Sequence, residues 1–182
     1  MELSDKKFAV LIDADNISHR KIKDILDEIA NYGTPTIKRI YGDFTDPKFA
    51  AWKSILLENS ITPIQQYAYT TGKNATDSAL IIDAMDILHK ESVNGFCIVS
   101  SDSDFTPLAI RLRESGLYII GAGVTTTPES FKNACDDFIL IDYLSKADEK
   151  PAAAEHAAEP AAKKPARKTK KTTRSTKKTA AE

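Results

Sequence analysis

Short runs of hydrophobic residues alternate along the chain with longer segments in which hydrophobic residues recur at helical spacing. A short apolar run between polar residues predicts a β-strand, and helical spacing predicts an amphipathic helix. We predict six strands, at residues 8–12, 36–42, 63–69, 96–100, 117–123 and 138–141. We predict five helices between them, at about residues 17–31, 47–59, 76–91, 104–115 and 128–134.

The first, fourth and fifth of these predicted strands are nearly unbroken apolar runs. Such strands are typical of the centre of a parallel sheet, where helices cover both faces. Because strands and helices alternate through short connections, we predict an α/β fold: a three-layer α/β/α sandwich with a central, mainly parallel sheet and right-handed crossovers. The hydrophobic fraction of 42% is sufficient for such a core.

The alternation stops before the C-terminal segment. From Pro151 onward this segment contains no apolar residue larger than alanine, apart from its prolines. A segment of this composition cannot bury enough surface to offset the entropy lost on ordering. We therefore predict one domain over residues 1–146 and a disordered Lys/Ala-rich tail over residues 147–182.

Charge divides the chain near the same point. Residues 151–182 contain nine Lys or Arg and three Glu, a net charge of +6, whereas residues 1–150 carry a net charge of −7. Clustered cations neutralise phosphates and give salt-dependent, sequence-independent affinity for nucleic acid. We interpret the tail as a nucleic-acid-binding arm, with a purely solubilising tail as the alternative. Its cations are Lys163, Lys164, Arg167, Lys168, Lys170, Lys171, Arg174, Lys177 and Lys178.

The two cysteines, Cys97 and Cys135, lie in apolar or mixed surroundings and form no C-x-x-C pair. This pattern favours buried thiols in a reducing compartment over a disulfide framework or a zinc site. The N-terminal apolar run, residues 8–12, is too short for a signal sequence or a membrane span. We expect a cytoplasmic protein with no membrane partner.

Acidic residues gather where the predicted strands end. Asp13 follows the first strand, Asp43 the second, and Asp102 and Asp104 the fourth. In open parallel sheets, functional groups lie outside the carboxyl ends of the strands. Carboxylates brought together there repel one another unless a cation or a proton lies between them. Such an oxygen-rich cluster suits Mg²⁺ or Mn²⁺, ions that activate water and stabilise charge on a phosphodiester.

Each aspartate has an ordinary explanation when it is taken alone. Asp15 or Asn16 could cap the first helix, and Asp104 could cap the fourth. Asp77 lies in the first turn of the third helix, where the helix dipole favours an anion. Their joint placement favours a metal site, because so much like charge in one place requires compensation.

The same residues resemble the NYN domain, specifically its LabA-like branch. The matching motifs, in the family's order, are IDADN (12–16), YGDF (41–44), KNATDSALIIDAMD (73–86), SSDSDF (100–105) and ACDDFILID (134–142). The resemblance extends over about residues 7–142. NYN domains belong to the PIN-like nuclease superfamily, so the resemblance implies a Rossmann-like sheet with a metal-dependent ribonuclease-type site. It further implies that the metal ligands, and the catalytic residues, are Asp13, Asp77, Asp102 and Asp104.

The resemblance also places Asn16 in the same pocket, as a substrate-binding residue. Many LabA-like proteins carry a small helical RNA-associated domain after the NYN domain, whereas here only the tail follows. On the third helix, Asp83 and Asp86 lie roughly 240° and 180° around the axis from Asp77, so the three do not face one pocket. We therefore expect a supporting or solvent-facing role for Asp83. We place Asp43 at the rim.

Several other residues have two interpretations. Lys73 could contact a phosphate of the substrate or be a solvated loop lysine, and Ser100 and Ser101 could touch substrate or form a turn. His19 is interpreted as part of an exposed polar face and not as a catalytic base. The adjacent aspartates Asp136 and Asp137 precede the last predicted strand and are interpreted as part of a turn. Four aromatic residues flank strand ends and could stack on unpaired bases, although core or rim packing is the commoner role of such residues and is favoured for the third: Tyr41, Phe44, Tyr67 and Tyr69.

Three functions fit this pattern. The leading hypothesis is a metal-dependent nuclease with a four-carboxylate site, acting on RNA more readily than on DNA. A second and weaker enzyme hypothesis is a haloacid-dehalogenase-like phosphatase, because Asp13 and Asp15 match the start of its D-x-D motif, whereas Asn16 and residues 102–104 fit that class poorly. The third is a non-catalytic regulator that binds RNA or DNA.

Overall fold

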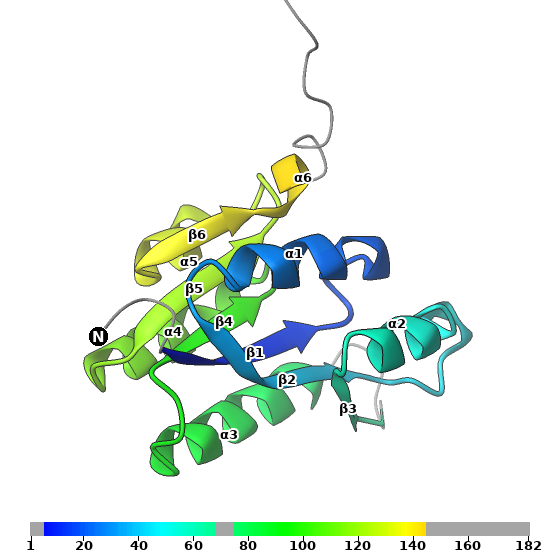
Figure 1. The fold of residues 1–182 in the computed structure, drawn as a ribbon, viewed down its shortest axis with the longest axis horizontal. Coiled ribbons are helices and arrows are strands. Elements are labelled where there is room, and N and C mark those ends of the chain that lie inside the picture. The colour runs from blue at the N-terminus through cyan, green and yellow to red at the C-terminus, as the bar shows by residue number, and fades with distance from the viewer. Residues whose placement is uncertain (1–5, 68–74, 145–182) are drawn as a thin grey trace, which may run out of the picture. The chain divides into compact units, whose positions relative to one another are not determined.

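The computed structural model describes residues 6–67 and 75–144. Within them the chain forms one six-stranded sheet in which every neighbouring pair of strands is parallel, in the order β3-β2-β1-β4-β5-β6 (Figure 1). The strands are β1 (Lys7–Asp13), β2 (Thr34–Gly42), β3 (Thr62–Gln65), β4 (Gly95–Val99), β5 (Tyr118–Gly123) and β6 (Asp137–Leu140). The predicted α/β sandwich with its parallel sheet is confirmed.

Helices cover both faces of this sheet (Figure 1). One face is covered by α1 (Ile22–Ile29), α2 (Trp52–Glu58) and α6 (Ile141–Leu144). The other is covered by α3 (Ala75–His89), α4 (Thr106–Glu114) and α5 (Glu129–Ala134). Three short 3₁₀ helices precede α1, α2 and α4, namely η2 (His19–Lys21), η3 (Pro47–Phe49) and η4 (Ser103–Phe105).

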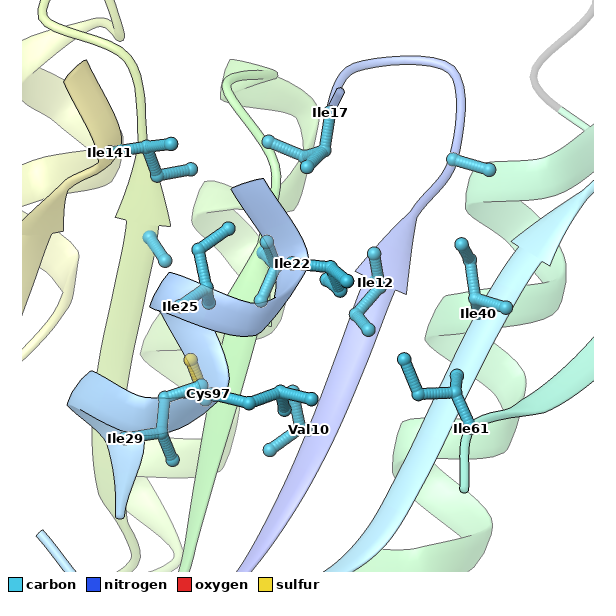
Figure 2. Close-up of a cluster of buried hydrophobic side chains, with 14 of the residues drawn as sticks. Val10, Ile12, Ile17, Ile22, Ile25, Ile29, Ile40, Ile61, Cys97 and Ile141 are labelled. Atoms are coloured by element: carbon cyan, nitrogen blue, oxygen red, sulfur yellow. The ribbon is translucent and has the colours of Figure 1, made fainter. Parts of the chain in front are cut away.

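The core on the α1 face is built from side chains that alternate along the strands. Val10 and Ile12 of β1 point to this face, where α1 presents three isoleucines at helical spacing (Figure 2). These are Ile22, Ile25 and Ile29, each almost fully buried. Burial of a side chain of this size contributes about 1.5–3 kcal/mol. The helical period seen in the sequence therefore corresponds to real packing.

The opposite face of β1 packs against α3. Ala9 and Leu11 point to this side, together with residues of α3, α4 and α5. Because successive strand residues point to opposite faces, Asp13 falls on the same side as Leu11. The last residue of β1 therefore faces the layer that contains α3, while the chain itself turns away toward α1.

The most hydrophobic strands lie in the interior of the sheet. Every residue of β4 is buried, as are all but the first residue of β1 and of β5, and these three strands lie inside the sheet. The edge strand β3 is partly exposed and ends at Gln65, whereas the predicted strand extended to residue 69. It ends there because β2, its one partner within the described residues, ends at Gly42, which is the residue paired with Gln65.

Two further sequence expectations can be compared with the structure. Cys97 and Cys135 are free and buried, as predicted. Burial raises the pKa of both thiols, that of Cys135 to about 12. Among the described residues, no helix is both long and apolar enough to cross a membrane. The predicted tail, residues 147–182, lies outside the described residues.

Candidate metal centre at the carboxyl edge of the sheet

The centre lies where the chain changes direction across the sheet. After β1 the chain builds β2 and β3 on one side, and the later strands extend from β4 on the other side. β1 and β4 are therefore neighbours whose following loops diverge, and the crevice at such a switch point is the usual ligand site in open α/β sheets. Asp13 ends β1 here, and Ser100 follows β4 directly.

Three carboxylates converge at this crevice. Asp77 stands in the first turn of α3, Asp102 precedes η4, and Asp104 lies within η4. One carboxylate oxygen from each lies within 4.8 Å of the others. Asp77 and Asp102 are half-buried and Asp104 is exposed, so the cluster is open to solvent on one side. Three hard oxygen donors at this separation fit a small divalent cation.

Local backbone structure explains how Asp102 and Asp104 come to face one place. Asp102 has an extended backbone and caps η4, and its Oδ1 accepts a hydrogen bond of 2.9 Å from the Asp104 backbone N–H. The backbone N–H of Asp102 donates to the Ser100 hydroxyl at 3.1 Å. Asp102 therefore caps the 3₁₀ helix η4, which contains Asp104, and Phe105 precedes α4, so Asp104 is not the N-cap of either helix. Capping needs only one oxygen of Asp102, so the other is available to the cluster.

Asp13 is fully buried next to the cluster and is held in place by three hydrogen bonds. Its Oδ1 accepts from the Asp15 backbone N–H at 3.1 Å. Its Oδ2 accepts from the Asn16 amide and, at 3.0 Å, from the Ser100 hydroxyl. Burial raises the pKa of Asp13, and these hydrogen bonds act in the opposite direction. Asp13 is not one of the three carboxylates that converge within 4.8 Å.

Ser100 joins Asp13 to the cluster. Its hydroxyl donates to Asp13 and accepts from the Asp102 backbone, so one buried side chain sets the positions of both aspartates. From the sequence, Ser100 was expected only to contact substrate or to form a turn. The signal that could have identified this role is a small hydroxyl residue directly after a fully buried strand, at the position that faces the end of β1.

The charge of Asp77 is surrounded by like charge rather than by cations of the described residues. The pKa of Asp77 is raised to about 6, first by burial and then by the negative charges of Asp13, Asp102 and Asp104. Within residues 6–67 and 75–144, no Lys or Arg forms an ion pair with Asp77 or Asp102. A carboxylate with a raised pKa among other carboxylates favours a bound proton or a bound cation.

The remaining acidic candidates serve other contacts. Asp15 pairs with Lys48 at 2.8 Å, which does not favour the general-acid role that a phosphatase would require. Asp43 accepts a hydrogen bond from the Gln65 side chain at 2.7 Å and so joins the ends of β2 and β3. Asp83 supports the fold from the side of α3, where it pairs with Arg39 and accepts from the Tyr41 hydroxyl.

The pair of aspartates at 136–137 is also engaged in structure. Asp136 accepts from the Ile119 backbone N–H and Asp137 from the Tyr32 hydroxyl, both at 2.8 Å. Asp137 is the first residue of β6, so the predicted turn reaches into the strand. Both residues tie β6 to its surroundings.

The described substrate candidates make contacts near the ends of β1 and β4. Asn16 is exposed to solvent, and its side-chain amide donates a hydrogen bond to Asp13. The Ser101 hydroxyl accepts from the Val124 backbone N–H at 3.0 Å and so links the ends of β4 and β5. His19 is half-buried with its ring edge-on to that of Trp52, a correction to its predicted exposure. Lys73 and the tail cations lie outside the described residues.

Of the four aromatic candidates, Tyr41 packs in the core, which was one of its two interpretations, whereas Tyr67 differs from its interpretation. Tyr41 is fully buried under Asp83 and is therefore not a base-stacking residue. Tyr67 was interpreted as a packing residue, but it is 54% exposed because it follows the last paired residue of β3. Phe44 is half-buried after β2, and Tyr69 lies outside the described residues.

A parallel α/β sheet with carboxylates at its switch point defines a Rossmann-like protein with an acidic, oxygen-rich site. The family model of the NYN domain matches residues 7–142, and the chain belongs to this family, a branch of the PIN-like nuclease superfamily. The structure is similar to the crystal structure of a protein of unknown function from Vibrio parahaemolyticus, with a TM-score of 0.64 and 19% identity over 79% of this chain and 98% of that one. At that identity the likeness shows the fold alone. A search of curated proteins found no match.

Proposed function

We propose that this NYN protein is a metal-dependent nuclease that hydrolyses phosphodiester bonds in RNA. The observation that carries the proposal is the set of three carboxylate oxygens from Asp77, Asp102 and Asp104 within 4.8 Å, at the switch point of a nuclease-superfamily fold. The LabA-like branch and the preference for RNA over DNA follow from the motif resemblance. The two buried free cysteines support the cytoplasmic location that the sequence predicts.

The same carboxylates fit Mg²⁺ or Mn²⁺ in donor type. Asp77, Asp102 and Asp104 would supply one oxygen each, and Asp13 would complete a four-carboxylate site from the floor of the crevice. A bound ion of this kind lowers the pKa of water and stabilises the charge that develops on a phosphodiester. The negative charge that raises the pKa of Asp77 is the charge that such an ion would neutralise.

The protein's own contribution is to hold these groups before substrate arrives. Ser100 and Asn16 orient Asp13, and the cap of η4 orients Asp102, so little rearrangement is needed on binding. Asp104 is exposed and lies on the solvent side, where a water molecule and a phosphodiester can approach. We place Asn16, Lys73 and Ser101 around the substrate strand, with Lys73 contacting a phosphate.

The deciding experiment compares two aspartates of one helix. Purified full chain is incubated with single-stranded RNA, structured RNA and single-stranded DNA, with Mn²⁺, Mg²⁺ or a chelator. We expect metal-dependent cleavage of RNA that Asp77→Asn abolishes. Asp86→Asn is the matched control, because Asp86 is exposed on α3 and lies outside the cluster. Equal cleavage by wild type and Asp77→Asn would show that the activity belongs to a contaminant. Binding without cleavage would favour the non-catalytic regulator.

The basic tail is proposed to hold the nucleic acid near this site. Its nine cations would release counterions from phosphates on binding, so affinity should fall steeply with salt. Truncation after residue 150 is expected to weaken RNA binding and to flatten the plot of log affinity against log salt concentration. Filter binding over a series of salt concentrations measures both effects. An unchanged slope would assign the tail a solubilising role only.

A further inference from the structure

A second feature lies on the same edge of the sheet, on the α1–α2 side. A groove with a volume of about 420 Å³ opens between α2, β3 and the loop after β2. Its wall is mainly apolar and is formed by Phe44, Phe49, Leu56 and Pro63. Lys53 also lines the groove. The volume is in the range of small-molecule binding sites. None of the cluster aspartates lines the groove.

The aromatic part of the groove is pre-organised. The rings of Phe44 and Phe49 are tilted by 55° with their centroids 5.7 Å apart. Phe49 is buried in the core, whereas Phe44 is half-buried. The backbone N–H of Phe44 donates to the Gln65 side chain at 2.9 Å, and Gln65 in turn donates to Asp43 at 2.7 Å. These bonds hold Phe44 against the end of β3 before any ligand binds.

A continuous series of contacts connects the groove to the carboxylates. Lys48 Nζ lies 4.6 Å from the centre of the Phe49 ring and 2.8 Å from Asp15 Oδ1. The backbone N–H of Asp15 donates to Asp13. Asp13 ends β1, and Gln65 ends β3, two strands away, so the groove lies roughly 10 Å along the carboxyl edge from Asp13. A chain molecule that occupies the crevice would reach the groove by passing over the carboxyl edge of the sheet, from the α3 face to the α2 face.

Charge identifies the kind of occupant. Lys48 lies beside the Phe49 ring and pairs with Asp15 and Asp46, and Lys53 lines the groove without an ion pair to any described residue. An apolar groove alone would also fit the side chains of a protein partner. Two lysines beside a pair of aromatic rings, on a path that begins at a candidate phosphodiester site, fit a polymer of anionic groups and flat bases better.

We propose that the groove between α2 and β3 binds an unpaired nucleobase of the RNA strand that is cleaved at the carboxylates. In this arrangement the base stacks on Phe44, and Lys48 and Lys53 contact the phosphates on either side of it. The inference rests on the proposed function and adds to it a subsite that selects single-stranded RNA, because a paired base cannot leave its duplex without cost. It assigns Phe44 and Lys53 to substrate binding.

The test measures binding of a fluorescent single-stranded RNA by anisotropy, using the full chain with Asp77→Asn so that the strand stays intact. On this background Phe44→Ala is expected to weaken binding about tenfold, the usual effect of removing one stacking ring. Lys53→Gln, at an exposed position that does not endanger folding, should weaken binding and lower the salt slope. Leu57→Ala is the matched control, since Leu57 is 77% exposed on α2 and does not line the groove.

A series of RNAs with one abasic position then distinguishes stacking from an indirect effect. One abasic position should weaken binding as much as Phe44→Ala does, and combining the two should add no further loss. Additive losses at every position, or unchanged binding by both groove variants, would overturn the subsite while cleavage continues. Failure of the protein with its groove intact to bind any RNA would instead overturn the proposed function as well. Thermal unfolding of each variant confirms that the fold is retained.

Discussion

Helix α3 carries two aspartates whose surroundings are opposite. Asp83, in the middle of the helix, accepts hydrogen bonds from the Arg39 guanidinium and the Tyr41 hydroxyl of β2. Asp77, in the first turn, lies instead with Asp102 and Asp104 and has no ion pair with a described residue. Both side chains are partly buried on one helix of the same domain. They differ in whether the protein itself supplies the compensating charge.

The comparison separates two uses of a carboxylate. An aspartate paired with Arg39 contributes to the stability of the folded chain, because its charge is compensated within the protein. An aspartate surrounded by other aspartates lowers that stability until a cation or proton arrives. The paired aspartate needs no ligand, whereas the clustered aspartates indicate that a cation or a proton binds among them. Four predictions follow from this contrast, in order of decreasing effect.

The largest expected effect is on cleavage of RNA. Asp102→Asn removes a proposed metal ligand and should lower the rate by at least about 100-fold, more than the loss of an outer-shell partner. Asp83→Asn should leave cleavage within a few-fold of wild type, because Asp83 lies outside the cluster. Single-turnover cleavage with saturating Mn²⁺ measures both rates. Comparable losses in the two variants would remove the distinction between the two aspartates.

The next effect is stabilisation by the metal. A metal that binds only the folded protein adds about 2.7 kcal/mol at 100 times its Kd, which corresponds to a rise in Tm of roughly 5–10 °C for a domain of this size. Mn²⁺ and Mg²⁺ should therefore raise the Tm of wild type and of Asp83→Asn. Neither ion should raise the Tm of Asp102→Asn. If wild type shows no shift with either ion, the carboxylates are not a metal site.

A smaller effect is expected on the free energy of unfolding. Asp83→Ala leaves the Arg39 guanidinium and the buried Tyr41 hydroxyl without their acceptor, which should cost about 2 kcal/mol. Asp86→Ala on the same helix is exposed and should change stability by less than about 0.5 kcal/mol. Urea denaturation monitored by circular dichroism gives both values. An equal cost for the two substitutions would mean that the Arg39–Asp83 pair adds nothing to the fold.

The smallest effect is a dependence of stability on pH in the absence of metal. The pKa of Asp77 is about 6 in the folded protein and near 3.8 in the unfolded chain, so the folded state binds more protons between these values. Stability contributed by Asp77 is therefore lost as pH rises from about 4 to about 6, by about 1 kcal/mol after allowance for solvent screening. Asp77→Asn should remove this slope, as measured by urea denaturation in chelator at several pH values. A slope that persists in the variant would come from another group.

Most of the fold was predictable because it depends on local pattern. The apolar runs of β1, β4 and β5 and the spacing of isoleucines in α1 appear directly in the sequence, since burial on one or both faces imposes them. The end of β3 was not predictable, because it is set by the last residue of its partner β2. The four-residue helix α6 is too short to show a helical period.

The candidate site was predictable in part for the same reason. Asp102 and Asp104 follow an obvious strand, and the resemblance to NYN domains added Asp77. The hydrogen-bond partners of Ser100 and Asp83 were not visible, because they lie more than forty positions away along the chain. The partners of a polar side chain are set by which strands become neighbours.

Local pattern was therefore sufficient to establish the alternation of strands and helices, the acidic residues at the strand ends and the family. The path of the chain in three dimensions determined the strand order, which places β1 beside β4 and so brings Asp13, Ser100 and Asp102 into one network. It also determined which carboxylates are compensated. Side-chain periodicity is a property of neighbouring residues, whereas electrostatic compensation depends on residues that only folding brings together, and for that reason Asp77 and Asp83 look alike in the sequence and differ in the protein.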